Sequence, residues 1–144
     1  MLHAIEDIGC IFPITPAAPA AGANFTTTLD VNFQSLIHAI TFRLVTDANA
    51  ANRYPGISFT YPTGEVFIFM PGTAITASTT ANVYLLPGLG TAVSYTANRY
   101  CSGLPTDFYV PRGTVVASYI ANIQAGDQLS VMSVVLRRWA DLPT

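Results

Sequence analysis

Residues 57–70 constrain the fold more than any other stretch of this sequence, because they combine two strand patterns with a turn between them. In 57–61, Ile-Ser-Phe-Thr-Tyr, large apolar residues alternate with Ser and Thr, which indicates a strand with one buried face. Pro62 and Gly64 suit the central positions of a tight turn. Residues 65–70, Glu-Val-Phe-Ile-Phe-Met, are rich in strand-forming side chains. We therefore predict a β-hairpin over 57–70.

Six further segments have the composition of strands and are separated by turns that contain Gly, Pro, Asn or Asp. They are 34–46, 82–86, 92–96, 107–110, 114–123 and 128–139. No window places apolar residues at helical spacing behind a capping residue. About seven or eight strands at this spacing predict an all-β fold, an antiparallel β-sandwich of the jelly-roll type.

Alternation assigns the two faces of the segment 34–46. The even-numbered positions 36 to 44 fall on one face, and the odd-numbered positions 37 to 45 fall on the other. His38 alternates with apolar residues on the first face, so we interpret it as a packed side chain rather than a base.

The segment 114–123 is apolar on both faces. Val115, Ala117 and Tyr119 alternate with Val116 and Ile120. An antiparallel strand with one face in water normally alternates apolar with polar residues. This segment therefore predicts a second sheet over one face and a neighbouring subunit over the other.

The N-terminal residues 1–30 predict an extended, Pro/Ala-rich arm in front of a sandwich domain at 31–144. Pro13, Pro16 and Pro19 recur at every third position, and proline excludes a helix interior. The arm also carries Ile11, Phe12 and Ile14, so it is not a polar linker. Two alternatives stay open: the arm packs on its own domain, or it packs on a neighbour.

The charge content is low for a soluble domain. Only 10% of the residues are charged, the net charge is −2, and all six basic residues are Arg. A codon bias explains the missing Lys but not the low total charge. A surface with few charges is typical of a protein packed against other subunits. The sequence has no basic cluster, no membrane-spanning helix and no signal peptide, so we expect neither nucleic acid nor membrane as partner.

The inventory of catalytic groups is small. His3 and His38 are the two histidines, and no metal-binding spacing, nucleophile motif or phosphate-binding loop is present. The eight acidic residues are scattered, so a glycosidase-like pair would have to form in space. We expect no enzymatic activity, no cofactor and no metal. Cys10 and Cys101 are read as free thiols, with a disulfide as the alternative.

Tyrosines near predicted loops leave a glycan-binding β-sandwich open as the alternative function. They are Tyr54, Tyr61, Tyr84, Tyr95, Tyr100 and Tyr109. Exposed aromatic rings can stack on sugars, but Tyr at a strand end often packs its ring and leaves its hydroxyl in water.

The tetrapeptide Ala-Asn-Arg-Tyr occurs at 51–54 and again at 97–100. The flanking residues do not match, so the repetition is attributed to chance rather than to duplicated halves. Each copy nevertheless places an arginine near the start of a strand. We expect Arg53 and Arg99 to bridge a loop carbonyl or a carboxylate of a neighbour.

Residues 36–139 resemble small virion proteins of tailed bacteriophages in the order of their features. An apolar strand at 36–44 is followed by Asn-Arg-Tyr-Pro-Gly and the hairpin at 52–67. An Ala/Ser/Thr-rich stretch occupies 73–90. Residues 104–139 then bring Leu-Pro, Pro-Arg-Gly and Gly-Asp turns and a last strand that ends in Trp139. The family usually has an acidic residue immediately before this Trp, whereas this chain has Arg138 at that position.

This resemblance implies a virion structural protein, either a capsid decoration (cement) protein or a minor head or tail component. It implies assembly with its own copies, with a trimer favoured, and with a major capsid or other virion protein. The location would be the virion, assembled in the host cytoplasm. We expect contacts with neighbours from residues of the arm, the two repeats and the last strand: Ile11, Phe12, Ile14, Phe25, Arg53, Arg99, Arg137, Arg138 and Trp139.

Overall fold

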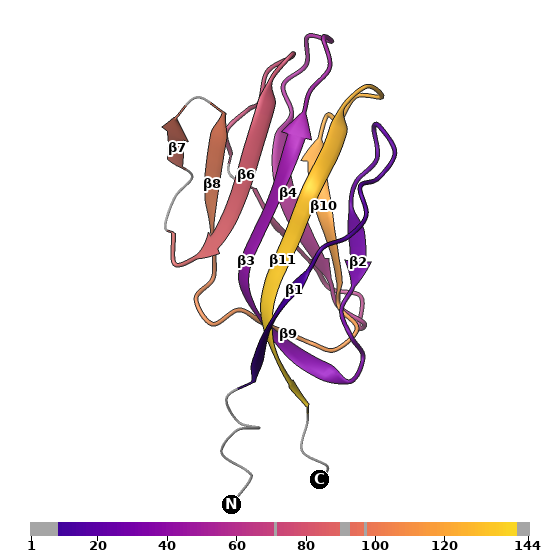
Figure 1. The fold of residues 1–144 in the computed structure, drawn as a ribbon, viewed down its shortest axis with the longest axis vertical. Coiled ribbons are helices and arrows are strands. Elements are labelled where there is room, and N and C mark those ends of the chain that lie inside the picture. Colours follow the sequence, from indigo (N-terminus) through magenta and orange to yellow (C-terminus); the bar gives the residue numbers. More distant parts are fainter. Residues whose placement is uncertain (1–8, 71, 90–92, 97, 141–144) are drawn as a thin grey trace, which may run out of the picture.

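The computed structural model describes residues 9–70, 72–89, 93–96 and 98–140, which form strands and no helix. In chain order the strands are β1 (Cys10–Ile14), β2 (Thr26–Thr28), β3 (Phe33–Val45), β4 (Tyr54–Thr60), β5 (Val66–Phe69), β6 (Thr80–Pro87), β7 (Val93–Thr96), β8 (Arg99–Leu104), β9 (Tyr109–Val110), β10 (Val115–Ala121) and β11 (Gln128–Ala140) (Figure 1).

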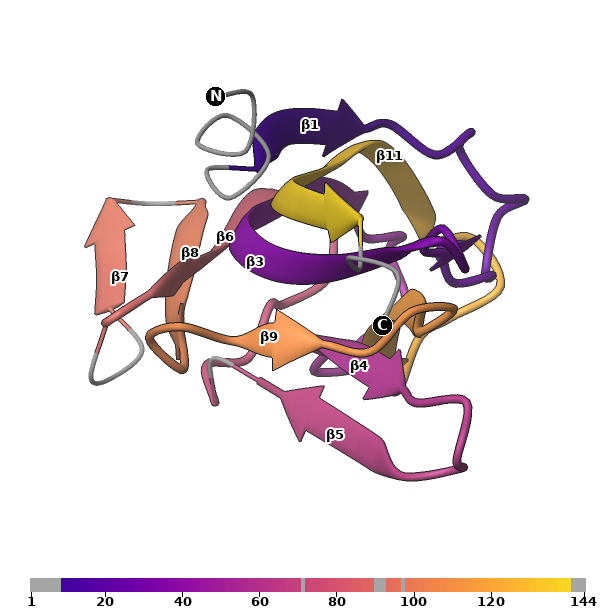
Figure 2. The same ribbon diagram turned by 90° about the horizontal axis from the view of Figure 1, so that it is seen from below.

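The strands form two sheets that pack face to face, so the predicted all-β sandwich is confirmed. The larger sheet has the order β1-β11-β3-β6-β8-β7, with β9 beside β3, and the smaller sheet has the order β2-β10-β4-β5. All neighbours are antiparallel except β6 and β8, which are parallel. Figure 2 shows the two layers end-on, with β4 and β5 on the side opposite β1 and β11.

The sandwich interior is a continuous apolar core. β3 contributes Ile40 and Phe42, and β4 contributes Ile57 and Phe59. An aromatic group joins the two sheets, because Phe59 meets Phe108 edge-on at 4.8 Å between ring centroids. Burial of these side chains, at about 25 cal/mol per Å² of apolar surface, holds the sheets together.

The predicted hairpin at 57–70 is present as β4 and β5, which are paired antiparallel. The predicted strands at 34–46, 114–123 and 128–139 correspond to β3, β10 and β11 within two residues at each end. The sequence missed β8, because Arg-Tyr-Cys-Ser-Gly-Leu has no β-branched residue and no clean alternation. Parallel pairing with β6 makes this segment a strand.

A β-bulge in β3 changes its face assignment halfway along. Val135 of β11 pairs with Ala39 and the next residue, Leu136, pairs with Ile37, so His38 is the extra residue. Ile37 and Ile40 are therefore both fully buried. The prediction from strict alternation, that Ile37 and Ile40 lie on opposite faces, is wrong. The extra residue at the bulge reverses which positions of β3 face the core on its two sides.

The described part of the N-terminal segment, from residue 9 onward, lies on its own domain. β1 pairs with β11, and β2 pairs with β10. Ile14 packs against the core, and Phe25 lies inside it with 1% exposure. The backbone N–H of Phe25 donates to the hydroxyl of Ser118 at 2.9 Å. The expected contact of Phe25 with a neighbour is wrong, because its side chain fills the interior of its own sandwich.

Candidate assembly surfaces

The outer face of the smaller sheet is apolar or neutral throughout. None of its four strands contains a charged residue. The register places Val66 opposite Thr60 and Ile68 opposite Ser58. Because the intervening Phe59 points into the core, these four side chains point outward. Val66 is 56% exposed and Ile68 46% exposed, so large apolar groups lie in solvent on this face.

The same face continues across β10. Tyr119 is 40% exposed, and its register partner on β4 is Gly56. A Cβ at Gly56 would lie 2.6 Å from the Cγ of Met70, so only glycine allows Met70 to pack here. The outer face therefore presents Val66, Ile68, Met70 and Tyr119 on a background of Ser, Thr and Ala. None of these β5 residues was among the expected contact residues, although the uncharged apolar run at 66–70 was a signal in the sequence.

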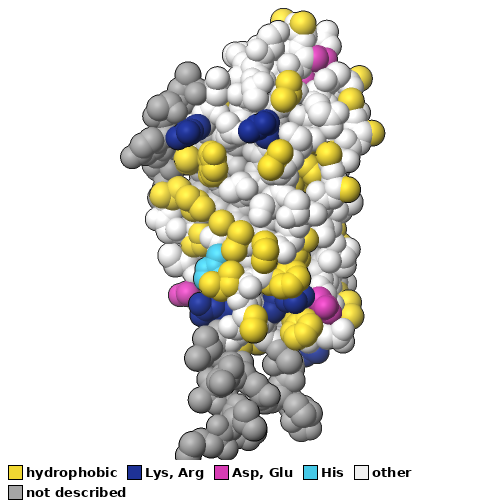
Figure 3. Space-filling model, viewed as in Figure 1, with side chains coloured by type: hydrophobic (Ala, Val, Ile, Leu, Met, Phe, Trp, Pro, Cys, Tyr) yellow, Lys and Arg dark blue, Asp and Glu magenta, His cyan; other side chains and the backbone are white. Residues whose placement is uncertain are grey.

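The outer face of the larger sheet is mixed. Figure 3 shows apolar side chains across its middle and arginines toward both ends. Ile11 on β1, Leu86 on β6 and Val131 on β11 are exposed apolar residues. Arg43 donates from Nε to the side-chain oxygen of Asn82 at 3.2 Å. This face combines charge with apolar groups, unlike the face of the smaller sheet.

The predicted residues of the arm and of the last strand meet at one end of β1 and β11. Ile11 is the register partner of Arg137, and Ile11 is 62% exposed. The guanidinium of Arg138 lies 3.9 Å from the ring centroid of Phe12. Trp139 lies beside Tyr109, with 5.8 Å between ring centroids.

Arg138 is held by a second aromatic ring and an acidic side chain of its own chain. Its guanidinium lies 4.8 Å from the ring centroid of Phe33, and its Nη1 lies 3.8 Å from Oδ2 of Asp30. Arg138 on β11 therefore links Phe12 of β1 to Phe33, the first residue of β3, and to Asp30. Arg138 thus has a role inside the domain in addition to the expected outward contact.

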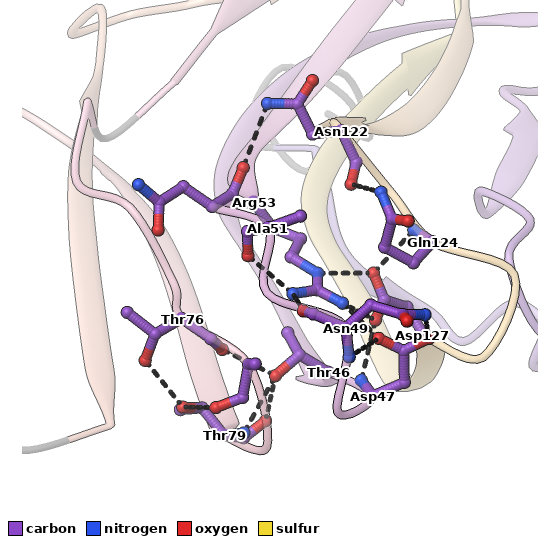
Figure 4. A network of polar contacts seen from close by, with 12 residues as sticks. Thr46, Asp47, Asn49, Ala51, Arg53, Thr76, Thr79, Asn122, Gln124 and Asp127 are labelled. Carbon is purple, nitrogen blue, oxygen red and sulfur yellow. Dashed lines mark hydrogen bonds and ion pairs between the residues drawn. The ribbon is translucent and has the colours of Figure 1, made fainter.

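Arg53 lies in the interior, and the expected contact of its side chain with a neighbour is wrong. The side chain has 0% exposure, because the loop before β4 folds over it. Its Nε and Nη2 donate to the two carboxylate oxygens of Asp127, each at 2.9 Å. Nη2 also donates to Asp47. Nη1 donates to the carbonyl oxygens of Asn49 and Ala51 at 2.8 and 2.6 Å (Figure 4).

All five N–H groups of the Arg53 guanidinium therefore have acceptors, which removes the penalty of a buried unpaired donor. Arg53 was also expected to bridge loop carbonyls, and it does donate to the carbonyl oxygens of Asn49 and Ala51. Arg99, the arginine of the second tetrapeptide, is exposed on β8. The two copies thus have unrelated environments, which is consistent with a chance repetition.

Asp127 is a carboxylate stabilised in its ionised form. Burial alone would raise the pKa of Asp127, but hydrogen bonds from Arg53 and from the backbone N–H groups of Gln124 and Asp47 hold it below its ordinary value. The same pairing raises the pKa of Arg53, chiefly through the hydrogen bond with Asp127. Both groups are charged near neutral pH and fully paired. We call the cluster of Arg53, Asp47 and Asp127 the brace, because it connects two loops.

Other chemistry of the chain is sparse. Cys10 and Cys101 are free thiols, exposed and half-buried respectively. Among the described residues, no three His, Cys, Asp or Glu side chains are grouped to bind a metal ion. The same ranges contain no helix that could span a membrane. The ring of Tyr61 packs against the ring of Phe67 at a tilt of 46°, with 5.0 Å between ring centroids.

No protein-family model matches the sequence, and comparison with curated proteins finds no match. Similar solved structures include a chain of the T13 particle of infectious bursal disease virus, with 11% identity and a TM-score of 0.39 over 91% of this chain. A chain of the Gt strain of that virus has 12% identity and a TM-score of 0.38 over 90%. A fructofuranosidase from Schwanniomyces occidentalis, complexed with fructosylnystose, has 9% identity and a TM-score of 0.32 over 90%.

This chain covers 31%, 32% and 33% of those three chains, respectively. It therefore spans about a third of the length of each. None of these likenesses identifies a family for the chain.

Proposed function

We propose that this protein is a structural subunit of a bacteriophage virion, a capsid decoration protein or a minor head or tail component. It packs against its own copies and against a shell protein. The observation that carries the proposal is the smaller sheet, whose four strands contain no charge and whose outer face exposes Val66, Ile68 and Tyr119. The position in the virion rests on the sequence resemblance over residues 36–139.

Apolar groups of this size are unfavourable in water, and covering them with a neighbour gains about 25 cal/mol per Å². Interfaces of permanent assemblies are large and depleted of charge at their centres. The outer face of the smaller sheet has that composition. No catalytic step is part of the proposal, since the paired carboxylates Asp47 and Asp127 are engaged with Arg53.

The test is the location of the protein in purified phage particles. An antibody raised against the recombinant chain should detect it in the particle band of a density gradient, at a fixed ratio to the major shell protein. Detection only in the unassembled soluble fraction would overturn the virion role. The glycan-binding alternative predicts binding of the recombinant protein on a glycan array, which the structural role does not.

A further inference from the structure

β5 is the outermost strand of the smaller sheet. It pairs with β4 on one side only, and its other side is the open edge of the sheet (Figure 2). Val66, Phe67 and Ile68 are all exposed, at 56%, 42% and 46%. In a strand with one covered face, buried and exposed side chains alternate. Three consecutive exposed apolar residues therefore show that neither face of β5 is fully covered by its own domain.

The hydrogen-bond pattern of the hairpin identifies the backbone groups on the open edge. The N–H of Tyr61 donates to the carbonyl of Glu65 at 2.9 Å, which makes these two residues a hydrogen-bonded pair. Hydrogen-bonded and non-hydrogen-bonded pairs alternate in an antiparallel ladder. The pair of Phe59 and Phe67 is therefore bonded to β4. The N–H and C=O groups of Val66 and Ile68 consequently point away from β4, along the open edge.

This edge strand is short, at four residues, but it lacks the other features that normally protect an edge. β5 contains no Pro, no charged residue and no irregularity in its register. β1, the edge strand of the larger sheet, contains Pro13, which cannot donate a hydrogen bond. The sequence Val-Phe-Ile-Phe-Met also has the apolar, uncharged composition that drives strand pairing between chains.

We propose that β5 of one molecule pairs antiparallel with β5 of a second copy of this chain about a two-fold axis. The two smaller sheets then join into one continuous sheet. The edge is self-complementary, because the open N–H and C=O groups of Val66 and Ile68 on one strand match the same groups on the other. The absence of charge on both strands removes like-charge repulsion, and leaves no charge by which a different partner would be selected.

This inference rests on the self-assembly part of the proposed function and specifies its contact. A two-fold contact predicts that the purified protein forms an oligomer with an even number of copies. If the trimer implied by the sequence resemblance also forms, its contacts lie on another surface, and two trimers would be joined through β5.

The first experiment measures mass by size-exclusion chromatography with light scattering. The wild-type chain should form a dimer or a larger even oligomer. Ile68→Pro removes an open-edge donor without removing a bond to β4, and should halve that mass. Ile68→Lys places two charges at the contact and should have the same effect. Val31→Lys is the matched control, because Val31 is 65% exposed outside the strands.

Circular dichroism of each variant should show that the sandwich remains folded. If Ile68→Pro unfolds the domain, Ile68→Lys decides the result. A wild-type oligomer whose mass is unchanged by Ile68→Lys would overturn the β5 contact, whereas the proposed function is decided separately by detection of the protein in purified particles. A wild-type monomer at all concentrations would overturn the self-assembly as well. A lone trimer would also contradict the two-fold contact.

Amide hydrogen exchange gives a readout specific to the edge. As protein concentration rises through the dissociation constant, exchange at Val66 and Ile68 should slow by at least about 10-fold. Phe67 and Phe69, which are bonded to β4, should be protected at every concentration. Equal exchange of Val66 and Ile68 in the dilute and concentrated protein would refute the pairing.

Discussion

Arg53 and Asp127 form a two-pronged ion pair in the interior, although 74 residues separate them in the chain. Both side chains have 0% exposure. Asp47, at 19% exposure, completes the charge cluster. The brace ties the loop before β4 to the turn between β10 and β11, and it is satisfied only when both are in place.

Arg53→Ala should destabilise the domain by about 3–5 kcal/mol, because it leaves the buried carboxylate of Asp127 without its partner. Urea denaturation followed by circular dichroism measures the free energy of unfolding. Arg99→Ala is the matched control in the second Ala-Asn-Arg-Tyr copy, where the arginine is exposed. It should change stability by no more than about 0.5 kcal/mol. Equal effects of the two substitutions would contradict the role assigned to Arg53.

The lowered pKa of Asp127 predicts a specific loss of stability in acid. In the unfolded chain this pKa returns to its ordinary value of 3.8, so the unfolded state takes up the proton first as the pH falls. The stability from the ionised carboxylate is complete above about pH 4 and is lost as the pH falls through the folded pKa. The free energies of unfolding of the wild type and Asp127→Asn should therefore converge below pH 4. A constant difference between them across this range would show that Asp127 does not titrate as inferred.

Val131→Gly should stabilise the protein by about 0.5–1 kcal/mol. Val131 is the exposed residue of a bulge in β11 and has φ of 52°, a left-handed conformation that a β-branched residue adopts at a cost. Glycine adopts it freely, and this gain exceeds the added entropy of the unfolded chain. Thermal and urea unfolding measure the change. The control Val45→Gly, at an exposed position of β3 outside the left-handed region, should destabilise instead.

Arg138→Ala should loosen β1 without unfolding the sandwich. The guanidinium lies 3.9 Å from the Phe12 ring and 4.8 Å from the Phe33 ring, and such contacts contribute about 1 kcal/mol together with the packing of the side-chain stem. Amide exchange in residues 10–14 should accelerate, while exchange in 26–28 should not change. Arg138→Lys should restore little of the protection, because an ammonium lacks the flat stacking surface. If Arg138→Lys retained the full amide protection of residues 10–14, the effect of Arg138→Ala would be due to the lost charge alone.

Local patterns predicted the hairpin of β4 and β5 because alternation and a Pro/Gly turn are properties of neighbouring residues. The same reasoning failed for Ile37, since the bulge at His38 arises from pairing with β11 and has no signature within β3. Local patterns also failed for Phe25, which was expected to contact a neighbour as part of the arm, and for Arg53, which was expected to do so as part of the repeated tetrapeptide. Their burial depends on Ser118 and Asp127, far along the chain.

The candidate assembly surface was predicted only in its general character. The two-sided apolar pattern of residues 114–123 indicated a covered outer face, and β10 does lie in the smaller sheet with Tyr119 facing outward. The order of strands, which makes β5 an open edge rather than an internal strand, is not encoded in the pattern of β5 itself.

The sequence by itself determined that the chain forms strands, where its clearest hairpin lies and that charge is scarce, because these follow from local periodicity and composition. The tertiary structure decided which arginine is buried, where the bulges shift the strand faces and which edge stays open. Those outcomes depend on partners distant in the chain, whose contacts exist only after the two sheets have packed.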